Sequence, residues 1–285
     1  MFNRSQILVL VLLFFLVFAT AAVAGSQDEP GAPLSYSDAR TFNNNGVDLV
    51  AKAKYQDAAK EFEKALAVDP DFHAARYNLA LAHYNMGKVK ESIAEFQRLV
   101  NGAYYFVNAH YNLGTIYLRE GMVDKAIEQL KIVEELEPGH AEAHFNLGYI
   151  YFNRNQLDDA ADEYKKGLGI KPDSAKGHLS LAFIYEKKGM YKEAADEYQA
   201  VLKIEPDHQN ARQAAGGLQA VAKIKESLAA NPKDASAYAY LGHIYYARGM
   251  YSEARDSYDK SLQIDPQNKT VKEALGKAAA QLAVK

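Results

Sequence analysis

The chain contains no cysteine among its 285 residues. A disulfide framework, thiolate ligation of zinc or iron-sulfur clusters, a cysteine nucleophile and a lipid-modified N-terminal cysteine are therefore excluded. The chain also lacks any block of like charge, and its 33 Lys and Arg against 36 Asp and Glu give a formal net charge of -3. Without a basic patch there is no electrostatic footprint for nucleic acid, so we expect no nucleic-acid partner.

Familiar catalytic motifs are missing as well. The sequence has no G-x-S-x-G, no P-loop, no G-x-G-x-x-G and no H-E-x-x-H motif. Its eight histidines are the best metal candidates, but His110, His144 and His178 recur every 34 residues, which repeat architecture explains better than ligation. We expect a protein that is not an enzyme, with no catalytic residues, no metal and no cofactor.

A long uncharged segment follows the first four residues of the chain. No charged residue occurs from Ser5 to Gln27, and this window contains a solid apolar run from Ile7 to Phe18. A basic residue before such a run and a small-residue site ending at Ala24 are typical of a secretory signal peptide. We expect residues 1–24 to be a signal peptide cleaved after Ala24.

An uncleaved membrane anchor through residues 5–24 is the alternative, because the uncharged window is just long enough to cross a bilayer. In either case the rest of the chain leaves the cytoplasm, and only an uncleaved N-terminal segment would contact a membrane. An exported chain without cysteine favours a bacterial envelope over a eukaryotic secretory route. We therefore expect a location in the periplasm or cell envelope of a bacterium.

Proline is scarce, and most of it is regularly spaced. Residues 25–38 hold two of the eight prolines and few apolar groups, so we expect a flexible linker there. The other six are Pro70, Pro138, Pro172, Pro206, Pro232 and Pro266, separated by 68, 34, 34, 26 and 34 residues. A 34-residue period predicts a repeat protein.

Six full repeats fit this period. They are residues 39–72, 73–106, 107–140, 141–174, 175–208 and 235–268. The eighth position is small in every repeat: Gly46, Ala80, Gly114, Gly148, Ala182 and Gly242. The twentieth position is Ala except at Ser92, and the twenty-fourth is aromatic except at Leu130. Two amphipathic stretches in each repeat predict two helices, and glycines such as Gly87 and Gly121 predict a tight turn between them.

These columns resemble the tetratricopeptide repeat family. The resemblance implies an all-α fold, a right-handed superhelical solenoid of helix-turn-helix repeats. We expect five repeats over 39–208 and one over 235–268, followed by a capping helix over 269–285. Residues 209–234 are too short for a full repeat, so they form either a compressed, atypical helical repeat or a single bridging helix.

In this family the first helix of each repeat lines a concave groove, which implies a partner-binding site. The candidate groove residues are Tyr77, Asn78, Tyr84, Tyr111, Asn112, Arg119, Phe145, Asn146, Tyr149, Phe152 and Phe183. They predict an aromatic, weakly charged surface suited to a protein segment. Asn78, Asn112 and Asn146 resemble the asparagine ladder of O-linked N-acetylglucosamine transferases, or they are inherited repeat consensus.

The leading hypothesis is an exported adaptor or scaffold that binds a segment of a partner protein in this groove, in assembly or maintenance of an envelope complex. One alternative is a structural protein that assembles with copies of itself into a homo-oligomer. Another is an accessory subunit of an envelope enzyme. The sequence leaves the identity of the partner open.

Overall fold

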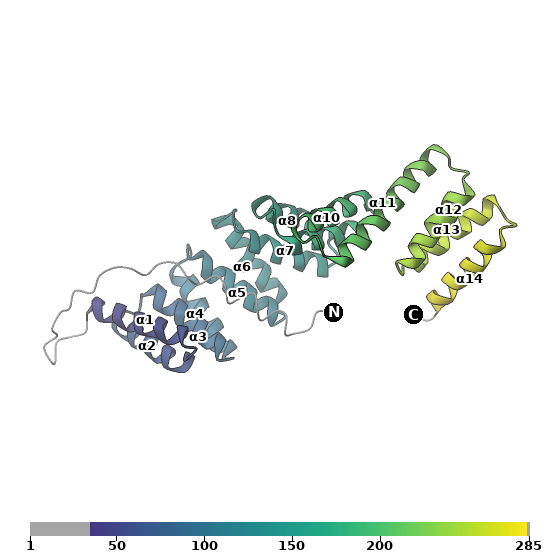
Figure 1. Cartoon of the computed structure of the whole chain (residues 1–285). Coiled ribbons are helices and arrows are strands. Elements are labelled where there is room, and N and C mark those ends of the chain that lie inside the picture. The colour runs from purple at the N-terminus through teal and green to yellow at the C-terminus, as the bar shows by residue number, and fades with distance from the viewer. Residues whose placement is uncertain (1–34, 284–285) are drawn as a thin grey trace.

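The computed structural model describes residues 35–283, which form fourteen helices and no strand. The expected signal peptide and nearly all of the linker lie outside the described residues. Within them the helices follow one another as antiparallel pairs stacked in a row (Figure 1). The prediction of an all-α solenoid is confirmed.

The first helices of the five N-terminal repeats are α1 (Tyr36–Ala51), α3 (His73–Asn85), α5 (Val107–Arg119), α7 (Ala141–Asn153) and α9 (Ala175–Lys187). Their second helices are α2 (Tyr55–Val68), α4 (Val89–Gly102), α6 (Val123–Leu136), α8 (Leu157–Ile170) and α10 (Tyr191–Ile204). The C-terminal part consists of α11 (Gln209–Ala230), α12 (Ala235–Ala247), α13 (Tyr251–Ile264) and α14 (Lys269–Ala283).

Helix α1 begins at Tyr36, three residues earlier than the repeat register suggests. Ser35 is its N-cap, and the Ser35 backbone N–H donates a 2.5 Å hydrogen bond to the carboxylate of Asp38. This bond holds the pKa of Asp38 below its usual value. Residues 36–38, which we expected in the linker, are therefore helical, because a capping pair starts the helix there.

The turn within each repeat needs a left-handed backbone at one residue. Gly87, Gly121, Gly189 and Gly249 occupy this position with φ between 72° and 75°. Ala53 and Asn155 stand there in the first and fourth repeats, with φ of 55° and 58°. The turn is thus set by backbone geometry, and glycine is the residue that adopts it without strain.

The two helices of a repeat touch most closely at the eighth position. A Cβ atom on Gly242 would lie 2.5 Å from the Tyr258 ring, and one on Gly46 would lie 2.4 Å from the Phe62 ring. Both aromatic rings stand at the twenty-fourth position of their repeats and are buried. The small residue and the ring are therefore complementary halves of one contact.

Stacking between repeats supplies the rest of the core. Each second helix packs against the first helix of the next repeat as well as against its own partner. The seventh position is leucine in five repeats, and Leu79, Leu113, Leu147, Leu181 and Leu241 are all buried. Because the core continues from one repeat to the next, no repeat is an independent domain.

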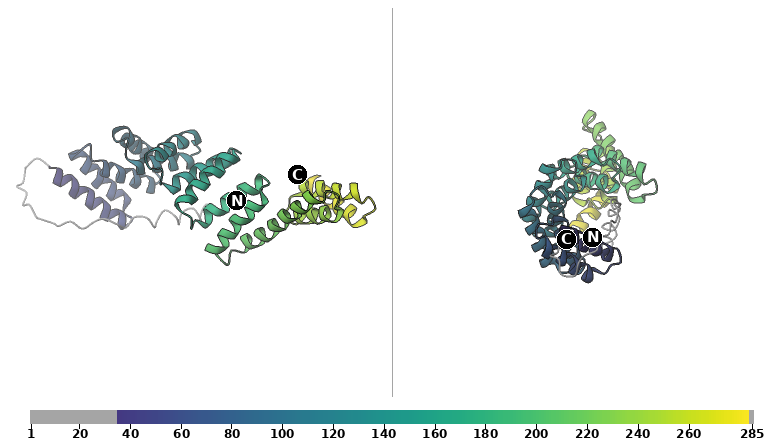
Figure 2. Two further views of the ribbon diagram at one scale, coloured as in Figure 1. Left: turned by 90° about the horizontal axis from the view of Figure 1, so that it is seen from above. Right: turned by 90° about the vertical axis from the view of Figure 1, so that its left-hand side faces the viewer.

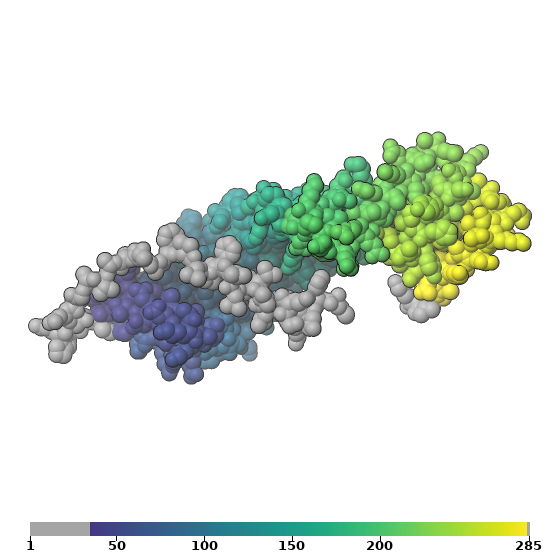
Figure 3. All heavy atoms as spheres, viewed as in Figure 1, coloured from purple at the N-terminus to yellow at the C-terminus, as the bar shows by residue number. Residues whose placement is uncertain are grey.

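Residues 209–230 form one uninterrupted helix, α11, so the bridging-helix alternative describes this block. The helix packs along α10 and also contacts α12, and α11–α14 extend the row at one end (Figure 3). Arg248 at the end of α12 donates a 2.6 Å hydrogen bond to Glu186 of α9, and Tyr198 of α10 donates another of 2.6 Å to the same carboxylate. This ion pair ties the last repeat to the fifth across the bridging helix.

Helix α14 closes the C-terminal end of the stack. Val271 and Ala278 are buried against the preceding helices, whereas Lys272, Glu273 and Lys277 are exposed. An apolar stripe with a polar back is what the last element of a solenoid requires. None of the described helices is long and apolar enough to span a bilayer.

The eighth-position contact gives a stability prediction. Gly242→Ala places a methyl group against the Tyr258 ring, so we expect the variant to lose about 1–3 kcal/mol of stability through overpacking. Gly276→Ala in α14 is the matched control, because a Cβ there meets no atom within 4 Å. The control should gain about 0.5–1 kcal/mol from helix propensity. Urea denaturation followed by circular dichroism measures both, and equal midpoints for the two variants would contradict the contact.

Candidate functional site

The first helices lie on the inner side of the curved stack. Asn78 of α3 donates a 2.9 Å hydrogen bond to Asn43 of α1, and Asn112 of α5 donates one of 2.7 Å to the Tyr77 hydroxyl of α3. Helix α1 also packs on α3, and α12 on α14, whereas no two consecutive second helices in residues 35–283 pack to that extent. A stack curves toward the side where its units are closer, so the first helices line the concave face. The helices wind around a common axis in the end-on view (Figure 2).

Tyrosines at the fifth position join neighbouring repeats. The Tyr77 ring lies 5.7 Å from the Phe96 ring and 5.4 Å from the Phe106 ring, and Tyr111 stacks at 4.5 Å on His140. Burial raises the pKa of the Tyr77 hydroxyl, while its hydrogen bond with Asn112 acts in the opposite direction. These half-buried rings therefore serve the stacking of repeats more than they serve an open groove.

The asparagines at the sixth position point along the stack. Asn78 and Asn112 each direct an amide N–H to the preceding repeat, and burial raises the pKa of the Tyr111 hydroxyl while Asn146 of the next repeat acts in the opposite direction. A ladder that binds a peptide backbone needs its amide donors free. The geometry favours the structural explanation of this column.

Phe145 is also part of the inter-repeat packing. A Cβ atom on Gly167 would lie 2.5 Å from its ring, and one on Gly177 would lie 3.1 Å away. Gly167 belongs to α8 and Gly177 to α9, so the ring fills a space that two glycines leave between consecutive repeats. Phe145 is half-buried and offers a partner only part of its surface.

Three other predicted residues form a group of two exposed rings and one half-buried ring, which we call the aromatic patch: Tyr149, Phe183 and Phe152. Tyr149 is 50% exposed and Phe183 is 46% exposed, and the Phe152 ring lies 5.6 Å from the Phe183 ring. The side chains come from α7 and α9, at the ninth and twelfth positions. The stacking of the described helices leaves Tyr149 and Phe183 about half exposed, so these two rings are available to a partner.

Arg119 and Tyr84 form a smaller exposed contact beside the patch. Arg119 donates a hydrogen bond to the Tyr84 hydroxyl, and its guanidinium lies 5.8 Å from the centre of the Tyr84 ring. Cation–π contact holds the arginine in place and leaves its other N–H groups free to donate. The arginine is exposed on the end of α5.

The recurring histidines, which the sequence attributes to the repeat, prove to join consecutive repeats. His144 contacts the Glu163 carboxylate through Nδ1 at 2.8 Å and the Pro138 carbonyl through Nε2 at 3.0 Å. Glu163 stands at the twenty-third position of the same repeat, and Pro138 lies in the loop that precedes it. A polar residue at the fourth position therefore fastens each loop to the next helix pair.

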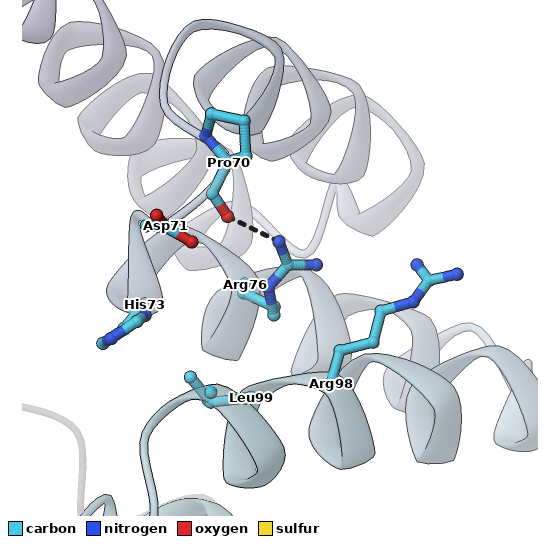
Figure 4. A pocket seen from close by; sticks show the side chains of 7 residues that line it. Pro70, Asp71, His73, Arg76, Arg98 and Leu99 are labelled. Atoms are coloured by element: carbon cyan, nitrogen blue, oxygen red, sulfur yellow. Dashed lines mark hydrogen bonds between the residues drawn. The ribbon is translucent and has the colours of Figure 1, made fainter.

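The same arrangement recurs along the stack. His178 contacts Glu197 and the Pro172 carbonyl, and His110 contacts Gln129 and the Tyr104 carbonyl. In the second repeat Arg76 donates to Glu95 and to the Pro70 carbonyl, as Figure 4 shows for the latter bond. Sequence reasoning missed these contacts, although a polar residue at the fourth position and a Glu or Gln nineteen residues later were visible as a pattern.

The hollow around Arg76 is small. It has a volume of about 170 Å³ and is lined by Pro70, Arg76 and Arg98 among others (Figure 4). Sites for small molecules usually have volumes of roughly 300–1,000 Å³. Arg76 and Arg98 both pair with Glu95, so their charges are already compensated within the chain.

One cluster brings together residue types that can bind a metal. Glu134, His144 and Glu163 place three ligand atoms within 4.8 Å of one another. Lys166 lies 2.7 Å from Glu134 and 3.0 Å from Glu163, and Lys131 lies 2.6 Å from Glu134. The ammonium groups of Lys131 and Lys166 therefore already bind the carboxylate oxygens that a divalent cation would need as ligands. The cluster acts as an ion-pair network between α6 and α8.

Comparison with known proteins supports the repeat assignment. Models of the tetratricopeptide repeat match residues 43–105, 111–175, 175–208 and 235–268. Small glutamine-rich tetratricopeptide repeat-containing protein 2 of Mycosarcoma maydis is 35% identical over 63 residues. That match spans 22% of this chain and 18% of the curated relative's length.

Several solved structures share the fold. MamA from Desulfovibrio magneticus superposes with a TM-score of 0.56 at 20% identity, over 62% of this chain and 99% of that one. A tetratricopeptide repeat protein from Parabacteroides merdae gives 0.56 at 19% identity, over 85% and 99% of the two chains. YrrB, a tetratricopeptide repeat protein with an unusual peptide-binding site, gives 0.54 at 22% identity, over 64% and 98%. At these identities the likeness concerns the fold alone.

The ion-pair network between α6 and α8 gives a pH prediction. Partial burial alone would raise the pKa of Glu134, but hydrogen bonds from Lys131 and Lys166 hold it below its usual value of 4.5. Because the folded-state pKa is the lowered one, Glu134 stabilises the fold above pH 4.5, and this contribution is lost as the pH falls through the folded-state pKa. We expect Lys166→Met to lower the melting temperature at pH 7 and to shrink its further fall between pH 7 and pH 3.

Lys165→Met is the control for this experiment, because Lys165 pairs only with the exposed Asp162. Its melting temperature should fall on acidification as far as that of the parent protein. Thermal melts followed by circular dichroism at the two pH values provide the comparison. Equal acid sensitivity of the two lysine variants would contradict a role for Glu134.

Proposed function

The chain belongs to the tetratricopeptide repeat family, and from this premise we propose that it is a non-enzymatic adaptor that binds a segment of a partner protein on its concave face. The observation that carries the proposal is the aromatic patch. Tyr149 and Phe183 are about half exposed, whereas Tyr77, Tyr111 and Phe145 on the first helices of the same stack are partly buried. Aromatic side chains provide much contact area at a small cost in conformational entropy, which makes them favoured interface residues.

The shape of the surface supports a segment rather than a small molecule. Tyr149 and Phe152 come from α7 and Phe183 comes from α9, so the patch spans two repeats and runs across the helix axes. A helical or extended segment can lie along such a concave row. The shared fold with YrrB, which has a peptide-binding site, is consistent with this use of the fold.

Substitution of the patch tests the proposed function. We expect Tyr149→Ser combined with Phe183→Ser to reduce capture of the protein partner at least tenfold, because each exposed ring contributes apolar contact area. Tyr105→Ser combined with Ile170→Ser is the control, since both side chains are exposed in or beside loops between repeats. The measurement is a pull-down with the purified protein, quantified by mass spectrometry.

The circular dichroism spectra of both double variants should match that of the parent. Capture by the patch variant at the level of the control would overturn the proposed function. Light scattering over a dilution series tests whether the partner is a second copy of the chain. A molar mass that rises with concentration in the parent protein but not in the patch variant would identify the partner as a second copy.

Export is a further part of the proposal. It is supported by the apolar run and small-residue site in residues 5–24, and it places the adaptor in a bacterial cell envelope, where it would serve assembly or maintenance of a complex. Expression with a C-terminal tag in a bacterium should place the protein in the periplasmic fraction, with Gly25 as its first residue. Mass spectrometry of the intact protein measures the cleavage, and a full-length chain confined to the cytoplasm would overturn this part of the proposal.

A further inference from the structure

Two cations flank the aromatic patch at equivalent positions of different repeats. Arg119 is the thirteenth residue of the third repeat and Lys187 is the thirteenth residue of the fifth, with the neutral Asn153 between them in the fourth. Both cations are exposed. Neither has a carboxylate within ion-pairing distance in residues 35–283.

Each cation lies over an aromatic ring of a first helix. Lys187 lies 5.6 Å from the centre of the Phe183 ring, and Arg119 lies 5.8 Å from that of Tyr84. A cation over a ring face has less conformational freedom to lose when it binds an anion, and its N–H donors still point outward. Tyr149, Phe152 and Phe183 lie on α7 and α9, the first helices of the two repeats that follow Arg119 along the stack.

The two carboxylates within α5, α7 and α9 are paired with cations, whereas Glu120, which follows Arg119 at the end of α5, is exposed. Glu142 of α7 lies 3.4 Å from Lys171, and Glu186 of α9 lies 2.6 Å from Arg248. The chain as a whole has a net charge of -3, so the positive charge of Arg119 and Lys187 is a local property of this surface. An acidic segment is attracted to these two cations.

We propose that the concave face selects protein segments in which apolar side chains are flanked by an acidic residue on each side. This inference rests on the proposed function and adds the chemistry of the partner. Arg119 and Lys187 stand two repeats apart, a separation of at least about 20 Å, because axes of packed helices are already roughly 8–10 Å apart and α5, α7 and α9 do not pack extensively on one another. An extended segment advances roughly 3.3 Å per residue, so the two acidic residues are at least about six positions apart.

Three fluorescent peptides of ten residues test the inference. They share an apolar centre of Leu and Phe and differ at two positions six residues apart, which carry Glu, Gln or Lys. Fluorescence anisotropy at low salt should give the tightest binding for the Glu peptide, about three- to tenfold tighter than for the Gln peptide, and the weakest for the Lys peptide. The advantage of the Glu peptide should fall at 300 mM salt because exposed charges are screened.

Arg119→Gln combined with Lys187→Gln should remove the preference, so that the Glu and Gln peptides bind with equal affinity. Lys90→Gln combined with Arg255→Gln is the control, since it removes the same charges from the second helices α4 and α13. The control should keep the parental preference. A reduced preference in both double variants would show a general charge effect and would overturn the inference.

The outcomes separate this inference from the proposed function. Equal binding of the Glu and Gln peptides, with both lost in the Tyr149→Ser and Phe183→Ser variant, overturns the acidic flank and supports the aromatic patch as a binding surface. Binding of the Glu peptide that survives loss of both rings overturns the role of the patch. Failure of all three peptides to bind at millimolar concentration overturns the acidic, apolar segment as the partner class.

Discussion

A pair of antiparallel helices cannot bury both of its faces, and this constraint governs the whole chain. Within a repeat, the contact between the eighth-position glycine and the twenty-fourth-position ring, as at Gly242 and Tyr258, sets the distance between the two helices. The leucines at the seventh position then meet the neighbouring repeats and are buried there. Stability is therefore a sum of small repeat terms and interface terms, and the chain remains folded only as a continuous stack.

The polar contacts between repeats serve the same constraint. Fourth-position side chains such as His144 and Arg76 bond the loop carbonyl before their helix and a side chain nineteen residues later. A loop carbonyl near the core needs a donor, because an unpaired buried polar group is costly. These side chains satisfy the backbone and fix the register between repeats at once, which explains why the same column is polar in repeats of otherwise different sequence.

Much of the fold could be predicted because backbone geometry selects the residue types. A left-handed turn selects glycine at Gly87 and Gly249, and close helix contact selects it at Gly46. The start of α1 was less predictable, because it depends on a local bond between Ser35 and Asp38 rather than on the repeat. The bridging helix is a similar case, because a helix pair can be shortened to 26 residues in more than one way.

The candidate site could be predicted only in outline. Fifth- and ninth-position aromatics look alike in the sequence, yet Tyr77 and Tyr111 are packed between repeats while Tyr149 and Phe183 are exposed. The difference follows the position of each ring on the first helix, which residue type alone does not give. Charge pairing is equally hidden, because Glu186 meets Arg248 across 62 residues while Lys187 beside it has no carboxylate partner in the described part of the chain.

Contacts across the bridging helix link the stacking of repeats to the charge of the concave face. By pairing with Arg248, which reaches it from the last repeat, Glu186 is neutralised and withdrawn from the concave face. The ion pair that fixes the last repeat against the fifth therefore also leaves Lys187 as the uncompensated charge at the end of α9. An architectural contact in this way shapes the electrostatics of the binding surface, because a carboxylate free to turn toward Lys187 would cancel the charge that an acidic partner needs.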